Sequence, residues 1–175
     1  MHRTHRPAVK SEFDQKIVDI ARVTRVVAGG KRMRFRASVI VGDGKGRVGF
    51  AVKKGADVSG AINKAVTAAK KTLVTVPIVN ETIPHEIKSK FGAAVVLLKP
   101  ASKGRGVIAG SSVRMIMELV GIKNIVSKML GSNNKLNNAR ATIQGLSSLM
   151  PPKKVADDKS EKKIEKTEEI NSDDK

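Results

Sequence analysis

A strict alternation of apolar and polar residues over positions 32–41 constrains the fold of this chain more than any other feature of its sequence. The apolar positions are Met33, Phe35, Ala37, Val39 and Val41, and the polar positions between them are Arg32, Arg34, Arg36 and Ser38. A period of two is typical of an antiparallel strand with one buried face. The pattern resumes at Val48, Phe50 and Val52. We therefore predict two adjacent strands, with Phe35 and Phe50 both on the buried face.

The segment between these strands, GDGKG at residues 42–46, begins a Gly44-x-Gly46-x-x-Gly49 spacing. That spacing is typical of dinucleotide-binding sites, but it needs a helix that opens on the glycines. Here the residues that follow alternate with a period of two instead. Asp-Gly supplies the positive φ angles that hairpin turns require. The sequence therefore predicts a structural turn at this point.

The neighbouring segments complete an α+β unit. The β-branched segment Ile17–Val27 predicts a first strand, and Asp57 is positioned to cap a helix. Helical spacing predicts that one face of that helix is buried. The residues of that face are Val58, Ile62, Ala65, Ala69 and Leu73. The prediction for this part is a three-stranded antiparallel sheet plus one helix.

A second α+β unit is predicted after the joining segment Val74–Glu81. Strands are expected at Thr82–Phe91, Ala93–Lys99 and Ile125–Leu130, with a helix capped by Ser111 or Ser112 and a last helix over residues 136–150. The predicted fold is thus α+β with two small domains, the second of β-α-β-α type. The expected boundaries are a basic flexible arm at 1–14, domains at 15–78 and 79–150, and a disordered mixed-charge tail at 151–175.

The charge of the chain is concentrated in its body. Residues 1–152 carry 27 basic and 8 acidic residues, a net of +19, whereas the tail from Lys153 carries 7 basic and 8 acidic residues, a net of −1. So basic a body points to a polyanionic partner, and nucleic acid fits better than a membrane because no long basic amphipathic helix is present. No apolar run is long enough to span a bilayer, and the absence of cysteine fits a reducing cytosol.

Basic residues that cluster without acidic neighbours are the candidate RNA contacts. Six cations fall within residues 22–36 with no acid among them, and we predict that Arg47 and Lys53 add to the same sheet face. With Phe35 and Phe50 buried and no Trp or Tyr present, phosphate contact and shape reading are favoured over base stacking. The full predicted RNA-binding set is Arg22, Arg25, Gly29, Gly30, Lys31, Arg32, Arg34, Arg36, Arg47, Lys53 and Lys54.

The glycine-rich segment before the Ser111 helix is a second candidate. Exposed amide groups near Gly104, assisted by Arg105, would suit a phosphate, and a purely structural loop is an equal alternative. Arg114 stands in the first turn of the helix, where a cation opposes the helix dipole. We therefore expect it to meet an anion or a partner's carboxylate rather than a residue of its own helix.

Catalytic and metal sites are not indicated by the sequence. The three histidines are separated, the body carboxylates are scattered, and no ligand pair has helical spacing. We expect no metal, no cofactor and no small-molecule substrate. A nucleotide-dependent transferase using Gly104–Gly110 would need a general base that is not evident. A free-standing RNA-binding regulator remains the alternative to a structural RNA-binding protein.

Three long segments together resemble one family. They are RVTRVVAGGKRMRFRASVIVGDGKGRVGFAV, TIPHEIKSKFGAAVVLLKPASKGRGVIAGSSVR and GSNNKLNNARAT, within Lys16–Leu149. They resemble the bacterial-type small-ribosomal-subunit protein five. The resemblance implies an N-terminal domain similar to a double-stranded-RNA-binding fold without its first helix, followed by a C-terminal domain of the family's own type.

The resemblance also implies a function. It implies a structural, non-enzymatic component of the cytoplasmic ribosome that binds small-subunit ribosomal RNA between body and head and contacts small-subunit proteins four and eight. The loop matching Arg22–Lys31 would lie near the spectinomycin pocket. The positions matching Gly106 and Arg114 belong to the region linked with protein four and with translational accuracy.

Overall fold

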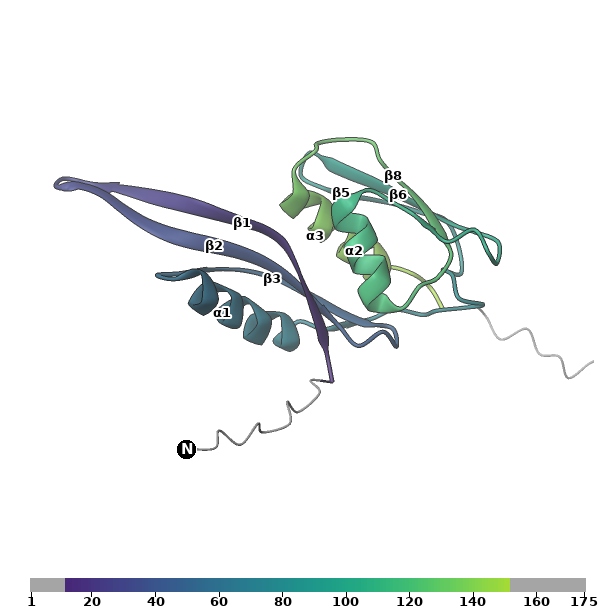
Figure 1. The fold of residues 1–175 in the computed structure, drawn as a ribbon. Coiled ribbons are helices and arrows are strands. Elements are labelled where there is room, and N and C mark those ends of the chain that lie inside the picture. The colour runs from purple at the N-terminus through teal and green to yellow at the C-terminus, as the bar shows by residue number, and fades with distance from the viewer. Residues whose placement is uncertain (1–11, 152–175) are drawn as a thin grey trace, which may run out of the picture.

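The computed structural model describes residues 12–151. Nearly all of the predicted arm at 1–14 and tail at 151–175 lies outside these residues. The described chain forms two α+β units, as predicted. In Figure 1, the helices α2 and α3 of the second unit lie between its own sheet and the sheet of the first unit.

The N-terminal unit is an antiparallel meander with one helix on it. Its strands are β1 (Asp14–Val27), β2 (Gly30–Gly42), β3 (Arg47–Gly55) and β4 (Val74–Thr75), in that order across the sheet, and α1 spans Val58–Lys71. The predicted three strands and helix are confirmed, with a two-residue fourth strand added. Asp57 occupies the N-cap position of α1, but its side chain makes no capping hydrogen bond.

Small residues let α1 approach the sheet closely. Ala61, Ala65 and Ala69 are fully buried against β2 and β3. A Cβ at Gly49 would lie 2.3 Å from the Ala69 carbonyl oxygen, and one at Gly55 would lie 2.6 Å from the Ala61 nitrogen. The buried face of α1 is therefore centred on its alanines. Of the predicted face, Ala65 and Ala69 are confirmed as buried, whereas Val58, Ile62 and Leu73 are only half-buried because larger side chains do not fit where the helix is closest to the sheet.

The C-terminal unit contains a mixed sheet and two helices. Its elements are β5 (Ile87–Phe91), β6 (Ala94–Pro100), β7 (Val107–Ile108), α2 (Ser111–Val120), β8 (Ile125–Met129) and α3 (Lys135–Ser147), and the sheet order is β5-β6-β8-β7. Only β7 and β8 pair in parallel. The predicted strands at Thr82–Phe91, Ala93–Lys99 and Ile125–Leu130 correspond to β5, β6 and β8, and the two predicted helices to α2 and α3, whereas the short strand β7 lies in a segment predicted to be a loop.

The start of α2 differs from the prediction. Gly110 is its N-cap residue and no side chain caps it, so neither Ser111 nor Ser112 has the predicted role. A Cβ at Gly110 would lie 2.3 Å from the Met129 methyl carbon. The Met129 side chain thus packs over the start of α2, in the place of a polar capping side chain.

One apolar core joins the two units. Ile40 and Val48 of the first sheet belong to the same buried cluster as Ile116, Met117 and Leu119 of α2. The opposite side of β2 packs under α1 through Ala37, Val39 and Val41. The second half of β2 is thus buried on both faces, which corrects the prediction of a half-buried strand.

Candidate nucleic-acid interface

Several cations toward the free end of the β1–β2 hairpin have no ion-pair partner within residues 12–151. Figure 1 shows this end extending past α1 and away from the C-terminal sheet. In the antiparallel register, Arg25 lies opposite Arg32, and Arg36 lies opposite Lys54 of β3. Directly opposed residues share a sheet face, and so do alternate residues of one strand. One face therefore carries Arg25, Arg32, Arg34, Arg36 and Lys54, which we call the arginine face.

The arginine face is a shallow groove as well as a charged surface. Arg25, Arg32, Arg34 and Lys54 line it together with Val23, Thr24 and Val27. Within residues 12–151, none of these four cations forms an ion pair. Such cations can neutralise phosphates without first losing a partner within the protein.

The other predicted cations lie elsewhere. Arg22 is opposite Phe35 and Lys31 is opposite Val26, so both are on the reverse face of the hairpin. Lys53 is opposite Ala37, whose side chain is buried beneath α1. The prediction that Arg47 and Lys53 share the face of Arg32, Arg34 and Arg36 is therefore wrong.

The physical reason for this correction is the assignment of the β3 faces. Phe50 lies opposite Ile40, and both are on the side of the C-terminal unit. Phe35 instead packs on the α1 side. The two phenylalanines are thus half-buried on opposite faces, and the side of β3 that holds Gly49, Ala51 and Lys53 faces the helix.

Two of the predicted RNA contacts have acidic partners. An Arg36 guanidinium nitrogen lies 3.8 Å from Asp19 Oδ2, and Arg47 Nε donates to Asp43 Oδ2 at 2.6 Å. Arg47 also lies 3.3 Å from Glu12 Oε1. The predicted absence of acids around these two arginines is therefore wrong.

At the hairpin turn, Gly30 has φ +132° and open space around it, whereas Gly29 has no positive φ.

The GDGKG segment is a turn, as predicted, with φ +67° at Gly44 and +98° at Gly46. Its amides have an unpredicted role: Gly44 N donates to Leu119 O at 3.0 Å, and Gly46 N donates to Val120 O at 2.9 Å. The last carbonyls of a helix lack partners within it. The turn therefore caps the C-terminal end of α2 and joins the two units.

Asp43 fixes the shape of this turn. Its Oδ1 accepts hydrogen bonds from the Lys45 and Arg47 amides, and its Oδ2 accepts from Arg47 Nε. The side chain is 3% exposed. Burial alone would raise the pKa of Asp43, but the hydrogen bonds from the Arg47 side chain and the two amides hold this pKa below its usual range.

The loop before α2 does not offer free amides at the predicted phosphate site. Gly104 N and Gly106 N both donate to Asn124 Oδ1 at 3.1 Å, and Arg105 N donates to Ser102 O at 3.3 Å. Two alternatives were predicted, exposed amides near Gly104 assisted by Arg105 and a purely structural loop, and these contacts favour the structural loop because the amides organise the loop itself. Sequence reasoning missed Asn124, which is buried. Gly106 has φ +74°, the left-handed geometry that favours glycine.

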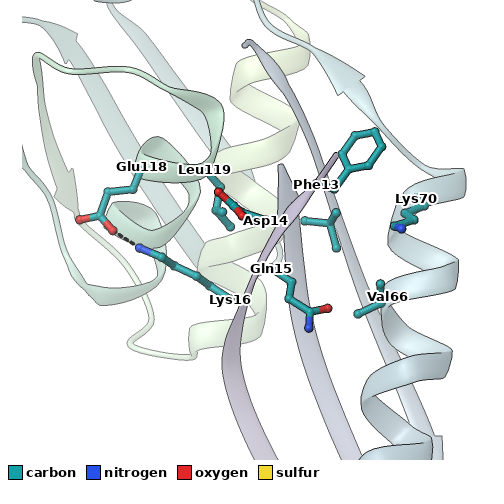
Figure 2. Close-up of a pocket in the computed structure, with 9 residues that line it drawn as sticks. Phe13, Asp14, Gln15, Lys16, Val66, Lys70, Glu118 and Leu119 are labelled. Atoms are coloured by element: carbon teal, nitrogen blue, oxygen red, sulfur yellow. Dashed lines mark hydrogen bonds and ion pairs between the residues drawn. The ribbon is translucent and has the colours of Figure 1, made fainter. Parts of the chain in front are cut away.

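Arg114 pairs within its own helix, contrary to the prediction. Its Nε donates to Glu118 Oε1 at 3.2 Å. Figure 2 shows Lys16 of β1 reaching the same carboxylate from the other unit. The Lys16 ammonium holds the pKa of Glu118 below its usual range; partial burial opposes this effect and Arg114 adds to it. Glu118 therefore links Arg114 to the N-terminal unit.

Residues 12–151 contain neither a metal-ligand cluster nor a helix suited to crossing a membrane. This part of the chain holds no group of three or more His, Cys, Asp or Glu side chains placed to bind a metal ion. None of its helices combines the length and the apolar character needed to cross a bilayer.

Comparisons with known proteins identify the family. Residues 13–77 match the family "Ribosomal protein S5, N-terminal domain", and residues 89–159 match "Ribosomal protein S5, C-terminal domain". A curated relative, "Small ribosomal subunit protein uS5c" of Emiliania huxleyi, is 55% identical over 139 residues, covering 79% of this chain and 87% of the relative. The chain therefore belongs to the ribosomal protein S5 family, and it is a structural, RNA-binding protein of the small ribosomal subunit.

Proposed function

We propose that this protein binds small-subunit ribosomal RNA through the arginine face and holds the head of the subunit relative to its body. The observation that carries the proposal is a group of four cations, three on the projecting hairpin and Lys54 beside it on β3, that have no ion-pair partner within residues 12–151. Direct phosphate contact suits these side chains because guanidinium groups bind phosphate in a bidentate manner. The absence of Tyr and Trp fits phosphate contact better than base stacking.

The salt dependence of RNA binding tests this proposal. Replacing Arg25, Arg32 and Arg34 together by glutamine should weaken binding to small-subunit RNA. Each lost phosphate contact should lower the log–log salt slope by roughly 0.7 to 0.9, so the triple variant should lose about 2. An unchanged slope would refute phosphate contact by this face.

A matched control removes the same charge from residues that already have partners. Lys99 pairs with Glu86, Lys123 with Glu81 and Lys135 with Asp19, and all three lysines are exposed. Replacing these three by glutamine defines the paired-lysine control. It should change the salt slope much less, because those charges are already neutralised within the protein.

The protein partners and the role in accuracy are a finer part of the proposal. We place small-subunit protein four at the loop that holds Gly106 and at Arg114, and we propose small-subunit protein eight as a second protein partner. Gly106 has open space around it, and Arg114 is 59% exposed, so both are accessible to a partner. The resemblance of the sequence to the family supports this assignment of partners. The compartment that we propose for the protein is the cytoplasm.

Stop-codon readthrough tests the accuracy assignment. In cells with normal abundance of the protein, Gly106→Arg and Arg114→Leu should each increase readthrough, because a loosened contact with a neighbour eases the closing movement of the subunit. The paired-lysine control should leave readthrough unchanged. Wild-type readthrough in both variants would refute the assignment and would leave the RNA-binding proposal intact.

A further inference from the structure

A second cationic surface lies on the opposite side of the N-terminal sheet from the arginine face. Strand β4 pairs only with Arg47 and Val48 of β3, so the rest of β3 has an open edge. A shallow groove beside this part of β3 is lined by Lys53, Asn63, Lys64, Thr67, Ala68 and Lys71. We call it the lysine groove.

The groove is on the β3 side of α1. Val66 and Lys70 are on the opposite side of α1, near Phe13, the residue before β1 (Figure 2). Lys64 and Lys71 are seven residues apart, about 10 Å along the helix at 1.5 Å per residue. Lys53 is exposed on the helix side of β3. Lys64 and Lys71 are therefore two turns apart on the same side of the helix, and Lys53 is on the strand beside them.

The charges of the groove have no counterpart in the fold. Helix α1 contains no Asp or Glu over its 14 residues. Lys53, Lys64 and Lys71 form no ion pair with any residue in 12–151, whereas Lys16, Lys99, Lys123 and Lys135 each do. Other lysines of residues 12–151, such as Lys31, Lys88 and Lys90, also lack ion pairs, but Lys53, Lys64 and Lys71 line one groove that contains no acidic residue.

Protection of the sheet edge does not account for this arrangement. A lysine on an open edge prevents pairing with other strands, and that reason covers Lys53. It does not cover Lys64 and Lys71, because these are on a helix with no backbone edge to protect. A partner of opposite charge accounts for all three.

We infer that the lysine groove binds the phosphate backbone of a second segment of ribosomal RNA, in duplex form. This inference rests on the proposed RNA-binding function and extends it to the opposite face of the domain. Lysine ammonium groups act as point charges toward phosphate, and no aromatic side chain lines the groove for stacking. Consecutive residues of a strand point to opposite faces, so Lys53 and Lys54 each contribute to one of the two surfaces.

The polar side chains of the groove suit RNA. Thr67 Oγ1 donates to Asn63 O at 2.9 Å, which leaves the hydroxyl oxygen free to accept a hydrogen bond. A ribose 2′-hydroxyl can donate such a bond, and DNA lacks this group. The Asn63 amide can donate to a phosphate oxygen. The N-terminal domain would then lie between two RNA segments.

Tethered hydroxyl-radical probing tests the inference, because the chain has no cysteine to interfere. Three single-cysteine variants, Lys64→Cys, Arg34→Cys and the control Lys99→Cys, are coupled to an iron chelate and assembled into small subunits. The cleaved RNA positions are then mapped. We expect Lys64→Cys and Arg34→Cys each to cleave RNA strongly, in different segments, and Lys99→Cys to cleave more weakly than either.

Each other outcome of the probing has a defined meaning. Cleavage from Arg34→Cys but not from Lys64→Cys would overturn the lysine-groove inference and leave the proposed function standing. Cleavage of the same RNA segment by both variants would overturn the inference that the groove binds a second segment. Crosslinking of Lys64→Cys to an acidic protein in place of RNA would also overturn the inference. Absence of cleavage from Arg34→Cys would count against the proposed function itself.

A binding measurement gives an independent test. Replacing Lys53, Lys64 and Lys71 by glutamine should lower the log–log salt slope for RNA binding by about 2, in addition to the loss from the arginine-face variant. The paired-lysine control should show a much smaller change. A slope equal to that of the wild type would refute phosphate contact in the groove.

Discussion

Replacing Gly121 by alanine tests the joint between the two units. Gly121 ends α2 with φ +92°, and a Cβ there would lie 2.2 Å from the Gly44 carbonyl oxygen. The added methyl group must push the Gly42–Gly46 turn away from the helix end. The two hydrogen bonds from the turn to Leu119 and Val120 would then weaken or break.

The expected loss of stability follows from these contacts. A non-glycine residue in the left-handed region costs about 1–2 kcal/mol. Each of the two hydrogen bonds contributes about 1 kcal/mol. The total is roughly 3–4 kcal/mol, and at about 2–4 °C per kcal/mol for a chain of this size Tm should fall by roughly 10 °C.

Two matched variants separate the conformational cost of a left-handed residue from the steric cost of the added methyl group. Gly104 has φ +88° and no atom within 4 Å of an added Cβ, so Gly104→Ala should show the conformational cost alone. Gly42 has no positive φ, but its Cβ would lie 2.3 Å from Leu119 O, so Gly42→Ala should show the steric cost alone.

Thermal unfolding followed by far-UV circular dichroism suits this chain, which lacks Trp and Tyr. The expected order is Gly121→Ala as the least stable variant, with Gly42→Ala and Gly104→Ala between it and the wild type. Equal losses in Gly121→Ala and Gly104→Ala would refute the role of the turn as a cap for α2.

Three further variants test other contacts. Asp43→Asn should lower Tm at neutral pH, because folding lowers the pKa of Asp43 and its ionised carboxylate therefore stabilises the fold. This stabilisation is present above the unfolded pKa, about 3.9, and is lost as pH falls through the lower pKa of the folded state. The Tm difference from wild type should therefore shrink near pH 3, and a constant difference would contradict this. Asn124→Ala should cost about 1–3 kcal/mol and speed hydrogen exchange at the Gly104 and Gly106 amides, which lose their acceptor; unchanged exchange would exclude that role. Gly49→Ala should force α1 from the sheet at a cost of about 1–3 kcal/mol, so a wild-type urea midpoint would count against such close packing.

The sequence was sufficient to predict the long elements because their periods are strong, whereas the two-residue strands β4 and β7 have no such period and were not predicted. Alternation over 32–41 and 47–53 predicted β2 and β3, and helical spacing after Asp57 predicted α1. Apolar–polar alternation predicts one buried face and one exposed face, and this prediction failed at β2. That strand is covered by α1 on one side and by the C-terminal unit on the other. Small residues at 49, 51 and 55 were the available signal for the helix-facing side of β3.

The ion pairs of the site could not be predicted from local patterns. Lys16 and Glu118 are 102 positions apart, and Arg36 meets Asp19 only because the hairpin register brings them together. These contacts decide which cations are free. A run of basic residues in the sequence therefore predicted the character of the surface, while the register selected the members of the arginine face.

The Gly44-x-Gly46-x-x-Gly49 spacing, which is typical of dinucleotide-binding sites, is explained here by the backbone geometry and packing of the three glycines. Gly44 and Gly46 adopt positive φ, and their amides point at the C-terminal carbonyls of α2. Gly49 has a separate role, giving room to α1. In a nucleotide site such amides meet a phosphate. Here they meet the negative end of a helix dipole. The chemistry of amide groups around partial negative charge is thus retained, but its partner is a helix of the same chain.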